Sequence, residues 1–109
     1  MNSQEAEEKI EAALTASLEF VDEIGGLGRK PRLRRHFNEL LGDLVYWLGT
    51  REAKGILGSG QNKALDRVHT ELSKSVGEGD WKQFHTILSK TLCPMLGQMA
   101  VKVRVANRS

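Results

Sequence analysis

The chain has 109 residues, 39% of them hydrophobic, and a formal net charge of +2 at pH 7. This length predicts a single domain over residues 1–109, and the one cysteine, Cys93, excludes an intrachain disulfide and a cysteine-cluster metal site. No run approaches the roughly 20 apolar residues of a membrane helix, and the N-terminal residues are acidic rather than basic. We therefore expect no membrane span and no signal peptide, with the cytoplasm as the location.

The small net charge hides blocks of opposite sign. Residues 1–24 carry seven acids and one base, whereas residues 25–54 carry seven bases and three acids. Residues 55–80 nearly balance, and residues 81–109 carry five bases and no acid. Because unlike blocks attract, this pattern favours packing of the first helix beside the second and creates faces that steer charged partners.

The first predicted helix covers about residues 3–24. Its apolar residues recur every three or four positions, which is the helical period: Ile10, Leu14, Leu18, Val21 and Ile24. The glycine-rich residues 25–28 then end it.

The second predicted helix begins near Pro31, reaches about 51–54, and has the widest apolar side in the chain. At 100° per residue, its apolar residues gather in an arc about 160° wide, against the roughly 100° of an ordinary surface helix. The arc holds Leu33, Phe37, Leu40, Leu41, Leu44, Val45, Trp47 and Leu48. Either the bundle buries all of it, or part of it is a contact surface centred on Leu41, Val45, Trp47 and Leu48, which would also favour a homodimer.

A basic cluster occupies residues 29–35, at the helix end where the macrodipole disfavours cations. One interpretation is a solvated helix start balanced by the acidic first helix. The other is contact with an acidic protein surface or with phosphate, in which Arg32 and Arg35 would take part. A DNA-recognition helix would expose polar residues along its length, so nucleic acid is the less favoured partner.

Residues 55–60 predict a flexible connection, and the following Gln61-Asn62 excludes a phosphate-binding loop of the Walker type. A third helix is expected over about 61–76, followed by a break at 77–79. Asp80 has the spacing of a capping residue for a fourth helix.

Pro94 predicts either a kink in this fourth helix or the start of a fifth. Residues 101–105 alternate with period two and could form a short strand, although helix to about 103 with a frayed basic tail at 104–109 is preferred.

The predicted fold is all-α, a compact bundle of four to five helices. His36, His69 and His85 lack the spacing of metal ligands, and no nucleophile, acid–base pair or cofactor motif is evident. We therefore expect a protein that is not an enzyme, holds no cofactor or metal, and acts by binding.

The acidic first helix, the segment RRHFNELLGDLVYWL and the later DWKQFHTILSKTLCPMLGQM together cover most of the chain. In these features the chain resembles the small helical anti-activators of bacterial quorum sensing, of the QslA type. The resemblance implies binding to the ligand-binding domain of a LuxR-type activator at the surface that the activator uses to dimerise. The expected function is thus inhibition of a protein partner; the alternative is a small helical nucleic-acid-associated protein that uses residues 29–35.

Overall fold

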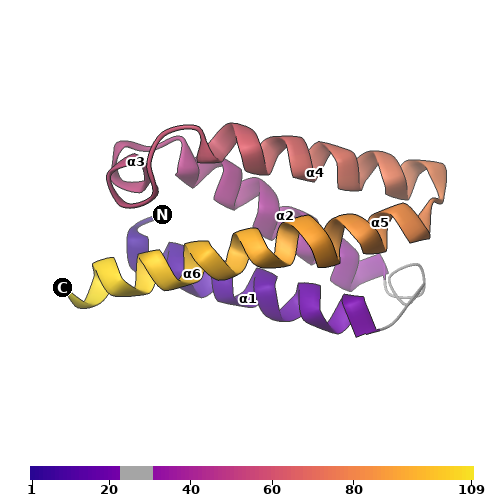
Figure 1. Cartoon of the computed structure of the whole chain (residues 1–109), viewed down its shortest axis with the longest axis horizontal. Helices are drawn as coiled ribbons and strands as arrows, with labels where there is room; N and C mark the ends of the chain where they lie inside the picture. Colours follow the sequence, from indigo (N-terminus) through magenta and orange to yellow (C-terminus); the bar gives the residue numbers. More distant parts are fainter. Residues whose placement is uncertain (23–30) are drawn as a thin grey trace.

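The computed structural model describes residues 1–22 and 31–109, and within these ranges every regular element is a helix. The elements are α1 (Ser3–Asp22), α2 (Pro31–Leu48), α3 (Arg51–Leu57), α4 (Gln61–Glu78), α5 (Trp81–Ile87), the π-helical segment η2 (Leu88–Leu92) and α6 (Cys93–Arg108). They pack into an elongated bundle of 41 × 22 × 22 Å (Figure 1). The predicted all-α bundle is confirmed. The predictions for residues 23–30 lie outside the described residues.

The first and last helices lie side by side and run in opposite directions (Figure 1). Asn107 on α6 donates to the Ser3 carbonyl at 3.1 Å and to the Glu7 carboxylate at 3.2 Å, and Ser3 Oγ donates to Asn107 Oδ1 at 2.6 Å. Helix α6 therefore stays regular to Arg108, and neither the short strand nor a frayed tail from residue 104 is found.

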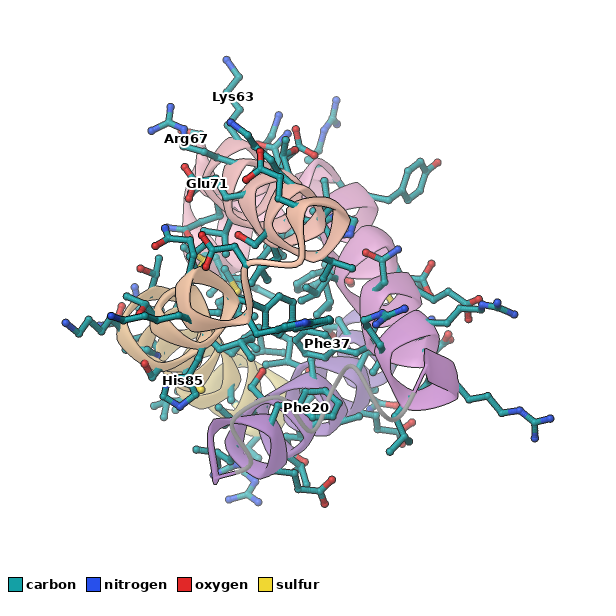
Figure 2. All side chains as sticks on the ribbon, turned by 90° about the vertical axis from the view of Figure 1, so that its right-hand side faces the viewer. Phe20, Phe37, Lys63, Arg67, Glu71 and His85 are labelled. Carbon is teal, nitrogen blue, oxygen red and sulfur yellow. The ribbon has the colours of Figure 1, made fainter. Side chains whose placement is uncertain are left out.

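Helix α2 packs against α1 on one side and α4 on the other. The rings of Phe20 and Phe37 meet edge to face, with centroids 5.5 Å apart, at the α1–α2 contact. Figure 2 looks along the bundle from the end where α4 turns into α5, and shows both rings inside it, while Lys63, Arg67 and Glu71 project outward from α4. The expected contact of the first two helices is present. Its ion pair, however, joins Lys9 of α1 to Asp43 of α2 at 2.7 Å, with the base on the acidic helix.

The second helix ends at Leu48, earlier than predicted, because Gly49 and Thr50 turn the chain. Thr50 Oγ1 accepts from the Ala53 amide at 3.3 Å and so caps the new helix α3. Trp47 Nε1 donates to the Glu52 carboxylate at 3.2 Å across this turn. Residues 55–57, expected in a flexible connection, therefore belong to α3.

Helix α4 continues through Gly77 to Glu78, and Gly79 ends it in the left-handed conformation with φ 70°. The predicted cap at Asp80 is confirmed, since its carboxylate accepts from the Gln83 amide at 3.0 Å.

At Pro94, where a kink or the start of a new helix was predicted, the structure has the π-helical segment η2 followed by α6. The Cys93 amide donates to the Leu88 carbonyl five residues back, which widens the helix by one residue immediately before Pro94. Pro94 then lies in the first turn of α6, the part of a helix in which proline is best tolerated.

Candidate binding cleft

The residues predicted as a contact surface on α2 lie mainly in the core. Leu41, Trp47 and Leu48 are each 1% exposed, and Val45 is half-buried against the core. Leu40 and Leu44, predicted to be core, are buried as expected. The wide apolar arc thus reflects a helix with neighbours on two sides, so these three buried side chains do not form a surface patch. The arc no longer gives a reason to expect a homodimer.

Leu33, at the N-terminal end of the same arc, is the exception. It lies about one turn before the buried Phe37, and 46% of it is exposed. Arg32 and Arg35 of the same turn are also exposed. The surface positions of these arginines agree with the sequence prediction, and the exposed Leu33 shows that the bundle does not bury the whole apolar arc.

A cleft of about 290 Å³ opens between α2 and α4 near this end. Its walls are one stripe from each helix at spacings of three or four residues, which is how two packed helices face each other. The lining residues are Arg34, Arg35, Phe37, Asn38 and Leu41 from α2, His69, Leu72, Ser73 and Val76 from α4, and Phe84 from α5.

Burial divides this lining into a floor and a rim. Phe37, Leu41, Leu72 and Phe84 are buried and give the cleft an apolar floor. The rim is polar, with Arg35, Asn38 and Ser73 exposed. The cleft therefore pairs an apolar interior with a positively charged mouth.

Two contacts hold the rim in place. The His69 ring hydrogen-bonds the Asn38 side chain and so links α4 to α2 beside the cleft. The Arg34 guanidinium lies over the Trp81 ring, 5.8 Å from its centroid, and Trp81 in turn meets Phe84 edge to face at 5.8 Å. Arg34 is thus positioned by α5, through an aromatic contact rather than through a carboxylate.

The acids of α1 do not balance the described arginines of the basic cluster. Over residues 1–20 and 32–109, no carboxylate forms an ion pair with Arg32, Arg34 or Arg35. The carboxylate of Glu11 instead pairs with Arg104 at 2.6 Å. The cluster's Arg29 and Lys30 lie outside the described residues.

Other chemistry is sparse in the part of the chain that the structure describes. No three His, Cys, Asp or Glu side chains gather there as metal ligands would, and no described helix is long and apolar enough to cross a membrane. Cys93 is half-buried, and burial raises the pKa of its thiol, which the hydrogen bond with Ser17 only partly opposes. A raised pKa disfavours the thiolate, so this cysteine lacks the activation of a nucleophile.

The cleft was not predicted from the sequence. The sequence pattern that could have indicated it is a pair of helical stripes, residues 34, 38 and 41 on α2 and residues 69, 72 and 76 on α4. Each stripe begins with a polar residue and ends with an apolar one. Which two stripes face each other depends on helix pairing, and the sequence alone did not supply that pairing.

The fold and the cleft define a small all-α bundle with a basic-rimmed opening at one end. Comparison with known protein families, with curated proteins and with solved structures gives no match for this chain.

Proposed function

We propose that the protein is a non-enzymatic regulator that binds and inhibits a protein partner through the first turn of α2. The observation that carries this proposal is an exposed leucine, Leu33, set in one turn with the exposed Arg32 and Arg35. Neither arginine has a carboxylate partner among the described residues. An apolar anchor with unpaired cations beside it is typical of a surface that recognises an acidic, partly apolar protein face.

The resemblance to quorum-sensing anti-activators supplies a specific partner for this proposal, the ligand-binding domain of a LuxR-type activator. The mechanism would be competition, because the bound protein covers the dimer interface of one activator subunit and so excludes the second subunit. Binding and activator dimerisation are then mutually exclusive.

The proposal can be tested by mixing the protein with a purified LuxR-type ligand-binding domain and measuring mass by analytical ultracentrifugation. We expect the activator dimer to be replaced by a complex containing one activator subunit. Leu33→Asp should abolish the complex, and Arg32→Glu plus Arg35→Glu should slow association and remove its salt dependence. The matched control is Tyr46→Asp, on the same helix and 82% exposed, which should leave binding intact.

Two results would count against the proposal. If Leu33→Asp and Tyr46→Asp both bind like the unaltered protein, the first turn of α2 is not the interface. If random duplex DNA binds tightly at low salt and the double arginine variant abolishes that binding, the nucleic-acid alternative replaces protein inhibition. A pull-down from native cells, followed by mass spectrometry, extends the test to partners other than LuxR-type activators.

A further inference from the structure

We infer that the cleft between α2 and α4 is a binding site for a small amphipathic carboxylate, a molecule with an alkyl or aryl body and one carboxylate group. This inference is independent of the proposed partner. It rests on the volume of the cleft, the burial of its floor and the sign of the charge at its mouth.

The floor selects an apolar body. Phe37, Leu41, Leu72 and Phe84 come from three different helices and are buried, so their positions are fixed by packing before any ligand arrives. A preformed apolar floor with a few polar groups at its edge is the usual composition of a small-molecule site. The volume of about 290 Å³ lies near the lower end of the roughly 300–1,000 Å³ typical of such sites, which favours a small ligand over a large cofactor.

The mouth selects a negative charge. Arg34 and Arg35 both line it, and no Asp or Glu does. Since neither arginine is neutralised by a carboxylate within the described chain, an anion at the mouth would meet two unpaired guanidinium groups. An ammonium group at the same place would be repelled.

The geometry of Arg34 favours a carboxylate in particular. Its guanidinium carbon lies over the Trp81 ring, 5.8 Å from the centroid. A guanidinium presents its N–H donors in a planar fork that matches the two oxygens of a carboxylate, and a contact with an aromatic ring uses none of these donors. Holding the group over the ring also reduces the side-chain entropy that binding would cost.

The inference can be tested by titrating the isotope-labelled protein with octanoate and following its amide resonances by NMR. We expect saturable shifts concentrated on the residues of α2 and α4 that line the cleft. Octylammonium, with the same tail and the opposite charge, and acetate, with the same charge and no tail, should not produce these shifts.

Three variants locate the site. Arg34→Gln plus Arg35→Gln should weaken octanoate binding by about tenfold or more, because charge-assisted hydrogen bonds are lost. Arg32→Gln, which removes a charge from the same helix but does not line the cleft, is the matched control and should bind as before. Ser73→Trp places a bulky side chain at the exposed rim and should block binding without touching the core. Thermal melts establish that each variant is folded.

The inference would be overturned by any of three results. Octanoate could fail to shift the cleft resonances of the unaltered protein. Octylammonium could bind as well as octanoate, which would show general apolar adsorption. Arg32→Gln could weaken binding as much as the double variant, which would show a diffuse charge effect rather than a site.

Discussion

The carboxylate of Glu11 on α1 lies 2.6 Å from the guanidinium of Arg104 on α6, across 93 positions of sequence. The hydrogen bond from this guanidinium to Glu11 raises the pKa of Arg104 above its ordinary value. The pair joins the acidic block at the beginning of the chain to the basic block at its end. Both side chains remain partly exposed, so solvent screens their attraction.

Reversing either charge of this pair should lower the melting temperature, and reversing both should restore most of the loss. We expect Glu11→Arg and Arg104→Glu each to melt below the unaltered protein because they place like charges opposite each other. The double reversal rebuilds the pair with its polarity exchanged. Glu8→Arg is the control, since Glu8 is an exposed acid of α1 outside the described ion pairs. A double variant that melts no higher than the worse single variant would show that the two groups do not interact.

Trp47 and Tyr46 are neighbours in sequence with opposite environments, 1% and 82% exposed. Trp47→Ala should lower the free energy of unfolding by about 3–5 kcal/mol, through lost contacts and a cavity. Tyr46→Ala should change it by less than about 0.5 kcal/mol. Urea denaturation of both variants measures the difference. A Trp47→Ala variant as stable as Tyr46→Ala would contradict the burial of Trp47 and favour the alternative that Trp47 belongs to an exposed contact surface.

Substituting alanine for Gly77 and for Gly79 should change the free energy of unfolding in opposite directions. Gly77 is helical, and a Cβ added there meets no atom within 4 Å, so Gly77→Ala should stabilise the protein by about 0.5–1 kcal/mol. Gly79 has φ 70°, so Gly79→Ala should cost about 1–2 kcal/mol. Both values come from the same denaturation measurement. Equal effects of the two substitutions would contradict the assignment of the α4 C-terminus.

The half-buried thiol of Cys93 should make the folded protein less stable at alkaline pH. Burial raises the pKa of its thiol in the folded protein, so folding favours the protonated form. That contribution is complete below the pKa of the unfolded thiol, about 8.5, and is lost as pH rises through the higher folded value. The free energy of unfolding should therefore fall more steeply above pH 9 in the unaltered protein than in Cys93→Ser.

The rate of alkylation is a second measurement on the Cys93 thiol. Iodoacetamide should modify Cys93 more slowly in the folded protein than in urea at the same pH, because less thiolate is present and access is limited. Equal rates in the two states would contradict the raised pKa.

Local signals in the sequence were sufficient for much of the fold. The helical period places Leu40 and Leu44 in the core, and the spacing from Asp80 to Gln83 marks a real cap. These features depend on residues within one or two turns of each other, so a single chain segment contains the whole signal.

Features that depend on distant partners were not predicted. A frayed basic tail was expected at residues 104–109, but Asn107 is held by Ser3 and Glu7 at the other end of the sequence. Likewise, the charge pattern suggested that acids of α1 would meet the start of α2, whereas Glu11 pairs with α6. Net charge per block does not determine which helix is the neighbour.

For the candidate surface, too, the features that depend on one helix were predicted, and those that depend on several helices were not. The exposed positions of Arg32 and Arg35 follow from charge alone, and the structure agrees. The width of the apolar arc correctly indicated a helix with more than one neighbour, but it could not tell a covered edge from an open one. The cleft is lined by residues of α2 and α4 together with Phe84 of α5, so it is a property of three helices together.

The pairing of α1 with α6 also has a consequence during synthesis. A ribosome makes α1 first and α6 last, so α2 can pack against α1 early, whereas the side of α1 that packs against α6 stays uncovered until almost the whole chain has emerged. A nascent chain stopped before Cys93 would still present that face to chaperones and proteases. Such a chain should be digested by a protease more readily than the complete protein, and protection should increase once residues 93–108 have left the exit tunnel.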